Sequence, residues 1–209
     1  SSFPVFSHRT SPVPSPVSAL HLCTVSASHF ILRGQRFDLD TPRVMVILNA
    51  TPDSFHAGSR VAGVSAADEA VRMVREGAAI LDVGGQSSRP DAERVGPAEE
   101  WRRVEPALEA IRTALPDVPI SIDTFHADVA RLALDAGADM INDISAGALD
   151  PELPMVVADQ RVPYAIMHMQ GTPDTMQDNT VYREVVHECK HRLEERCAKL
   201  KAIGIEHLV

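Results

Sequence analysis

Short apolar runs alternate with amphipathic stretches along the chain from about residue 43 onward. Within each run the apolar residues are continuous rather than alternating, which is typical of strands that are covered on both faces of a parallel sheet. The pattern therefore predicts six strands, at about residues 44–48, 80–83, 118–122, 140–144, 164–167 and 205–209.

The stretches between these runs carry the start and stop signals of helices. Residues 65–68 resemble a capping box before a helix that ends near Gly77. Pro97 suits the first turn of a second helix, because proline is tolerated where no backbone N–H is needed. Further helices are predicted at about residues 127–135, 152–159 and 182–202, and one apolar stripe of the second helix holds Trp101, Val104, Leu108 and Ile111.

Strict alternation of strands and helices implies right-handed crossovers and a parallel sheet, either closed into a barrel or open and doubly wound. The strand ends discriminate between the two. The first five strands all end on or next to residues with polar side chains, namely Asn49, Asp82, Asp123, Asn142 and His168. In a (β/α)8 barrel such ends surround one mouth, where the active site lies, whereas an open sheet would spread them along an edge. The sequence therefore favours a TIM-type (β/α)8 barrel.

These residue types suit a polar planar ring and an anion. The carboxylate of Asp123 can accept two hydrogen bonds from a guanidine-like N–H pair, and Asn142 can donate and accept at an amide-like edge. Arg89 offers bidentate contact to phosphate, although a salt bridge within its loop is an equal alternative. The oxygen of Asn49 is a hard ligand for a Mg²⁺ ion shared with a diphosphate. Gly84 and Gly85 would let backbone N–H groups approach the ligand.

Charge and composition narrow the class of protein. The chain has 209 residues, 20 basic and 29 acidic, for a net charge of −9. This balance argues against a nucleic-acid or anionic-membrane surface, since both need basic patches. No apolar run approaches the roughly 20 residues that span a bilayer. The three cysteines show no paired framework.

The first 37 residues differ from the rest in composition. They contain no Asp or Glu, three arginines, and the Pro-rich stretch at residues 12–16. We interpret residues 1–37 as a Ser/Pro-rich leader or linker, with an organelle transit peptide as the alternative. Residues 38–209 then form the domain. The expected location is cytoplasmic, or mitochondrial or plastid if the leader is a transit peptide.

Four segments carry a resemblance to a known family. They read ILNATPDSFHAGS at residues 47–59, DVGGQSSRPDA at residues 82–92, SIDT through NDIS at residues 121–145, and MHMQGTPDTMQ at residues 167–177. Together they resemble dihydropteroate synthase, and the likeness extends over about residues 31–209. The resemblance implies a TIM-type barrel that condenses 4-aminobenzoate with a dihydropterin carrying a 6-hydroxymethyl diphosphate.

The resemblance also implies a role for each matching residue. Asp123 and Asn142 would hold the pterin edge, with Asp82 beside it to stabilise positive charge. Arg89 would lie near the anion, so that Asp82, Arg89 and Asp123 would be the catalytic residues. Asn49 would bind Mg²⁺, and Met169 would lie against the pterin ring. Phe55, Ser88 and Pro90 would shape the aminobenzoate pocket. The resemblance further implies small-molecule substrates and a homodimer of the full-length protein, and no binding to nucleic acid or membranes.

The chain departs from the family pattern at three loop positions and in its length. Ala57 replaces the usual acidic residue, Gln86 stands where Glu is common, and Ser88 where Thr is common. We expect the loss of the carboxylate at position 57 to reduce turnover. The predicted strands repeat every 32 residues or so, so eight units need about 250 residues. We therefore expect about two-thirds of a barrel, through the sixth strand, with unpaired edges on its first and sixth strands.

Three other interpretations remain open. The segment from His187 to His191 matches the zinc-protease pattern H-E-x-x-H on a predicted helix. A folate-dependent methyltransferase domain would share the pterin-binding Asp and Asn. A non-catalytic pterin-binding relative or an inactive fragment would fit the short length and Ala57.

Overall fold

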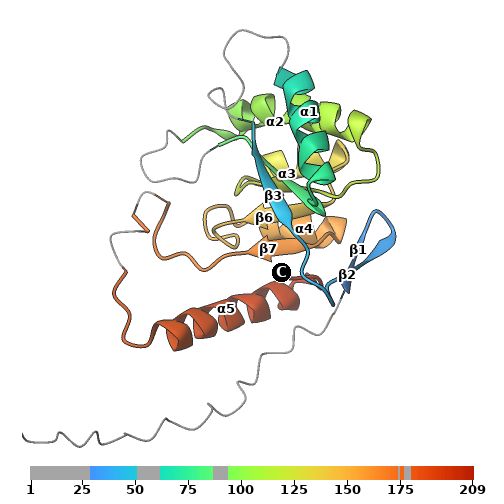
Figure 1. Cartoon of the computed structure of the whole chain (residues 1–209). Helices are drawn as coiled ribbons and strands as arrows, with labels where there is room; N and C mark the ends of the chain where they lie inside the picture. The colour runs from blue at the N-terminus through green and yellow to red at the C-terminus, as the bar shows by residue number, and fades with distance from the viewer. Residues whose placement is uncertain (1–28, 51–61, 87–93, 174, 177–179) are drawn as a thin grey trace, which may run out of the picture.

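A computed structural model of the chain describes residues 29–50, 62–86, 94–173, 175–176 and 180–209. Its centre is a five-stranded parallel sheet (Figure 1). The strands follow one another in chain order without a reversal, as β3 (Met45–Asn49), β4 (Ile80–Gly84), β5 (Ile120–Asp123), β6 (Met140–Asp143) and β7 (Tyr164–Ile166). A doubly wound sheet reverses its strand order at a switch point, so this order confirms the predicted partial β/α barrel.

Helices connect the strands and cover one face of the sheet. They are α1 (Ala62–Arg75), α2 (Pro97–Ala114), α3 (Ala127–Asp135), α4 (Leu153–Gln160) and α5 (Val185–Ala202). The first four pack against one another in chain order, whereas α5 lies apart from α1 and α2, near the C-terminus (Figure 1). The predicted start at Pro97 and the predicted span 127–135 are confirmed. The capping box at Ser65 is wrong, because α1 already begins at Ala62.

Successive side chains of each strand point to opposite faces, which separates the core from the barrel interior. The side chains that point to the helices form the main core, together with Val104, Leu108 and Ile111 of α2. The other face of the sheet carries the polar ends, including Asp82 and Asp123. The helix-facing residues are almost fully buried, as in Leu81, Val83, Ile120, Ile122 and Ile141.

A two-stranded antiparallel hairpin closes the amino end of the sheet. It consists of β1 (His29–Leu32) and β2 (Gln35–Asp38), joined by Arg33 and Gly34. Both turn residues have positive φ, at 53° and 72°, as a two-residue type I′ turn requires. The hairpin packs against the sheet through a second apolar cluster, formed by Phe30, Leu32, Ile80, Met140 and Ala165.

The hairpin changes the predicted boundary between leader and domain. We placed the boundary after residue 37, but residues 29–37 already belong to structure that packs on the sheet. The basic composition of this segment suggested a leader, yet Phe30 and Leu32 supply apolar area that the sheet buries. Residues 1–28 lie outside the described residues.

The two edges of the sheet differ. Met45 and Ile47 of β3 are exposed, as is Val44 just before the strand, and no described strand pairs with β3 on that side. On the side of β7, Leu208 forms a single parallel bridge to Tyr164. Within the predicted sixth strand at 205–209, residues 207–209 pair with β7 through three backbone hydrogen bonds, and β6 pairs with β7 on its other side.

Candidate active site

The polar ends of the strands lie in one row at the carboxyl edge of the sheet. The pairing register places Asn49 beside Gly84, Gly84 beside Asp123, and Asp123 beside Asn142. Asp82 precedes Gly84 by two residues and therefore lies on the same face, one layer deeper. The structure thus brings together four of the predicted site residues from four consecutive strands.

Asp82 and Asn142 are bonded directly across the interior. The amide nitrogen of Asn142 donates to Oδ2 of Asp82 at 2.9 Å. Asp82 is 1 % exposed, and its other oxygen, Oδ1, has no hydrogen-bond partner among the described residues. A buried carboxylate oxygen without a donor is costly. This oxygen is therefore available to a ligand that supplies an N–H group or positive charge.

The electrostatics of the site favour a cationic or N–H-rich ligand. Burial, together with the neighbouring charges of Asp82 and Asp143, raises the pKa of Asp123 to about 7. Burial also raises the pKa of Asp82, an effect that the Ser121 hydroxyl and the Asn142 amide oppose. Two acids held so close resist ionising together, so a ligand that brings positive charge relieves their repulsion.

Asp143 holds the backbone that follows the site. Its carboxylate is fully buried and accepts hydrogen bonds from the backbone N–H and hydroxyl of Ser145, each at 2.7 Å. The backbone N–H of Gly147 and the hydroxyl of Tyr164 donate to its other oxygen, each at 2.5 Å. This network fixes the turn after β6 and, with it, the neighbouring Asn142.

The predicted roles of the two glycines separate. A Cβ at Gly84 would contact Asp123 at 3.4 Å, so the bare backbone leaves room beside that carboxylate. A Cβ at Gly85 would lie 2.8 Å from the carbonyl oxygen of Glu100 in α2. Gly85 therefore serves close packing of helix and strand, and its approach to a ligand stays a prediction.

Asn49 and Met169 occupy the rim. Asn49 is exposed at the end of β3, in the same row as Asp123. Mg²⁺ in proteins often keeps several waters and takes one or two protein oxygens together with substrate phosphates, so a single exposed amide oxygen fits it. No group of three or more His, Cys, Asp or Glu side chains among the described residues could hold a metal by itself. Met169 is partly buried in the segment that follows β7.

The other predicted site residues lie outside the described residues. They are Phe55, Ser88 and Pro90, predicted for the aminobenzoate pocket, and Arg89, predicted to contact the anion. The altered loop residue Ala57 also lies outside the described residues.

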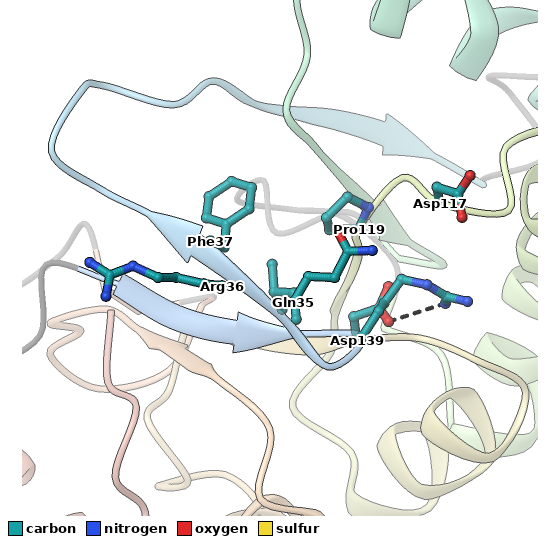
Figure 2. Close-up of a pocket in the computed structure, with 8 residues that line it drawn as sticks. Gln35, Arg36, Phe37, Asp117, Pro119 and Asp139 are labelled. Carbon is teal, nitrogen blue, oxygen red and sulfur yellow. Dashed lines mark hydrogen bonds and ion pairs between the residues drawn. The ribbon is translucent and has the colours of Figure 1, made fainter.

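A separate cavity of about 550 Å³ lies at the opposite, amino end of the sheet. Figure 2 shows Gln35 and Phe37 of the hairpin beside Pro119 and Asp139, which precede β5 and β6. Both arginines that line it are paired with acids, since Arg33 pairs with Asp139 at 3.3 Å and Arg36 with nearby Asp38 at 2.6 Å. The cavity is therefore a seam between hairpin and sheet and not a second centre of chemistry.

Among the described residues, no group of three or more possible metal ligands gathers around the H-E-x-x-H segment on α5. The rings of His187 and His191 stack at 6.3 Å between centroids, but the carboxylate of Glu188 accepts the backbone N–H groups of Arg183 and Glu184 at 2.8 and 3.1 Å. Glu188 thus satisfies the first turn of the helix. The pattern reports a helix start, and the protease interpretation receives no support.

Sequence reasoning missed two buried acids that support the site. Asp143 directly follows Asn142 and points to the helix-facing side of the sheet, where an acid signals a buried polar partner. Glu100 stands one turn before Val104 on the apolar stripe of α2, and an acid on such a stripe signals a buried polar contact. Glu100 accepts a hydrogen bond from Gln86 at 2.8 Å.

The chain is similar to known proteins along most of its length. A family model described as pterin binding enzyme matches residues 45–208. The dihydropteroate synthase of Synechocystis is 49% identical over 148 residues, which are 70% of this chain and 51% of that protein. The chain therefore spans about half the length of this relative.

Solved structures extend the likeness to the fold. The dihydropteroate synthase of Xanthomonas albilineans with 4-aminobenzoic acid superposes with a TM-score of 0.78 at 40% identity, over 87% of this chain and 64% of that one. The enzyme of Yersinia pestis in a sulfonamide drug complex gives a TM-score of 0.75 at 37% identity, over 85% and 64% of the two chains.

Proposed function

The chain belongs to the pterin binding enzyme family, and on that premise we propose that it carries the pterin half of a dihydropteroate synthase site. The reaction joins 4-aminobenzoate to a dihydropterin whose 6-hydroxymethyl group carries a diphosphate. The product is 7,8-dihydropteroate, and the diphosphate leaves. The single observation that carries the proposal is the cluster of Asp82, Asp123 and Asn142 at the carboxyl ends of neighbouring strands.

The residues of this cluster suit a pterin edge. The carboxylate of Asp123 can accept two N–H groups from the amino-pyrimidine side of the ring. Asn142 is already oriented by its bond to Asp82, so that its amide oxygen can accept while its nitrogen stays engaged. The ligand's N–H groups would replace the missing partner of Asp82 Oδ1. Binding should therefore strengthen as pH rises through about 7, where Asp123 ionises.

The same acids suit the chemistry. Loss of diphosphate from the methylene carbon leaves positive charge on the pterin, and Asp82 and Asp123 would stabilise that charge in a site sheltered from water. The amine of 4-aminobenzoate then forms the new C–N bond at that carbon and loses a proton. Because an aniline-type nitrogen needs little activation, the proposed reaction requires no Ser-His-Asp arrangement.

A Mg²⁺ ion would serve the leaving group. Asn49 would hold it from the rim of the site, and the ion when bound supplies charge that neutralises the diphosphate. Arg89 would add a cationic contact, and Phe55, Ser88 and Pro90 would shape the aminobenzoate pocket. Met169 would lie against the pterin ring.

The partners and location follow from the same proposal. We expect small-molecule substrates and a homodimer of the longer protein, in the cytoplasm, with mitochondrion or plastid as the alternative. Among the described residues, no helix is both long and apolar enough to cross a membrane.

The test is product formation by the 209-residue chain. Radiolabelled 4-aminobenzoate, the dihydropterin diphosphate and Mg²⁺ should give labelled dihydropteroate, which a sulfonamide suppresses by competing with aminobenzoate. Omission of Mg²⁺ should lower the rate. Pterin binding without condensation would instead identify a non-catalytic pterin-binding chain, and the absence of both would reject the proposal.

A further inference from the structure

A buried acid lies behind the candidate site and is not part of the proposed chemistry. Glu100 in the first turns of α2 is 0 % exposed. Its Oε2 accepts a hydrogen bond from the amide nitrogen of Gln86 at 2.8 Å, and Nε2 of His126 lies 3.7 Å from the same oxygen. Its Oε1 has no partner among the described residues. Burying an acid in this way is costly, so the fold retains Glu100 at the expense of stability.

Glu100 ties α2 to the end of β4. Gln86 follows that strand by two residues, and its side chain is 9 % exposed. Between strand and Gln86, Gly85 lies so close to Glu100 that any Cβ would clash with the carbonyl oxygen. The guanidinium of Arg103, one turn further along α2, donates to the carbonyl oxygen of Gly85 at 3.2 Å. The segment after β4 is thus held to α2 by the Gln86 side chain and by the backbone of Gly85.

Glu100 also faces the end of β5. Thr124 follows Asp123 directly, is 2 % exposed, and its hydroxyl lies close enough to Glu100 to lower the pKa of that acid. The same hydroxyl accepts the backbone N–H of His126 at 3.1 Å, and the backbone N–H of Thr124 donates to the carbonyl oxygen of Asn142 at 3.0 Å. The acid therefore lies between the ends of the two strands that carry Asp82 and Asp123.

We propose that Glu100 is a positioning residue of the pterin site, which sets the spacing of the ends of β4 and β5 by binding Gln86 and facing Thr124 and His126. This inference rests on the proposed function, because it assigns Glu100 to the site formed by Asp82 and Asp123. Glu100 itself touches no substrate in the proposal.

This positioning role requires a hydrogen-bond donor at position 86 opposite an acceptor at position 100. With Gln at position 86, the amide donates and the carboxyl accepts, so no shared proton is needed. With Glu at position 86, the residue common in the family, two carboxyls would meet at hydrogen-bond distance and could stay together only while they share a proton.

The surroundings of Glu100 support a proton-sensitive pair. The pKa of Glu100 is raised to about 7, mainly by burial and further by the charge of Asp123, while the Thr124 hydroxyl opposes the rise. The Gln86 amide and Arg103 lower the pKa. Among the described residues, five groups thus face Glu100. Gln86 follows β4, Asp123 ends β5, Thr124 and His126 follow β5, and Arg103 lies on the same helix as Glu100.

The experiment compares Glu100→Ala, Glu100→Gln, Gln86→Glu and the double variant Gln86→Glu/Glu100→Gln. Glu105→Ala and Glu105→Gln are the matched controls, since Glu105 is exposed on the same helix. Affinity for 6-hydroxymethyl-7,8-dihydropterin is measured by calorimetry at pH 6 and pH 8, and folding is checked by circular dichroism.

We expect Glu100→Ala to weaken binding about tenfold, the equivalent of one lost hydrogen bond to an ionisable group, and Glu100→Gln to stay within about threefold of the unaltered chain at pH 6, since the amide can still accept from Gln86. In Gln86→Glu, the affinity relative to that of the unaltered chain should fall by about another tenfold between pH 6 and pH 8, because the two carboxyls lose their shared proton. The double variant should recover both the affinity and the original pH dependence, because it restores one acid and one amide. A residue that merely fills space would not produce this recovery.

Two results overturn the inference: unchanged binding in Glu100→Ala, or a double variant that behaves like Gln86→Glu. If Glu100→Ala fails to fold, the two Gln86→Glu variants still decide. If the unaltered chain binds no pterin, the proposed function fails, and the inference is then judged by ¹³C NMR titration of the Asp123 carboxyl. That titration should shift in Gln86→Glu and return in the double variant, while an unchanged titration in both rejects the positioning role.

Discussion

Replacing Asp123 by Asn should stabilise the folded chain at alkaline pH while it impairs pterin binding. Burial and the charges of Asp82 and Asp143 raise the pKa of Asp123 from an ordinary 3.8 to about 7. A raised pKa means that the folded state loses stability as pH increases above 3.8, and that the loss is complete above about 7. The amide has the same shape as the acid but carries no charge at any pH, so it avoids this loss.

The magnitude follows from that pKa difference. At about 1.4 kcal/mol per pH unit, full ionisation of Asp123 costs the folded chain at most about 4 kcal/mol. Between pH 5 and pH 8 the part still to be lost is about 2 to 3 kcal/mol, because ionisation in the folded state ends near pH 7. Because Asp82 lies in the same interior and its titration is coupled to that of Asp123, this free energy is an order-of-magnitude value for the two acids together.

The assay is urea unfolding of the unaltered chain and of Asp123→Asn at pH 5 and pH 8. The advantage of the variant should be larger at pH 8 than at pH 5 by about 2 to 3 kcal/mol. Asp135→Asn, an exposed change on α3, should show no such pH-dependent gain. A gain that is equal at both pH values, or a variant less stable than the parent at pH 8, would refute the electrostatic account of the site.

Two further substitutions test the supports of the site. Tyr164→Phe removes the hydroxyl that donates to the buried Asp143 and should lower the free energy of unfolding by about 1 to 2 kcal/mol in urea, because three donors remain; an unchanged midpoint would contradict the network. Gly85→Ala places a Cβ 2.8 Å from the Glu100 carbonyl oxygen and should cost about 1 to 3 kcal/mol. Gly96→Ala, where no atom lies within 4 Å, should cost clearly less, because it loses only the preference for glycine at the N-cap of α2, and equal effects at the two glycines would count against close packing.

The order of the strands could be predicted from the sequence because each strand is a continuous apolar run that ends on a polar residue. The same rule located Asn49, Asp82, Asp123 and Asn142, since the carboxyl ends of parallel strands meet at one edge. Only the register could show that Asp82 lies one layer deeper and that Asn142 bonds to it.

The misses also have physical reasons. Local composition assigned residues 29–37 to a leader, but burial of Phe30 and Leu32 depends on Ile80, Met140 and Ala165 far along the chain. A capping box at Ser65 reads only four residues, and the helix had begun three residues earlier. Glu100 and Gly85 act on each other across a helix–strand contact that no single segment reveals.

The central claim is that Asp123 and Asn142, on neighbouring strands, together grip a pterin edge. The most direct test is calorimetric titration of the 209-residue chain and of Asn142→Ala with 6-hydroxymethyl-7,8-dihydropterin at pH 8. Asp117→Asn, at the amino end of the sheet, serves as the control. The account predicts one pterin per chain, with affinity reduced by about tenfold or more in Asn142→Ala and unchanged in the control. Equal affinity in Asn142→Ala and the unaltered chain would contradict it.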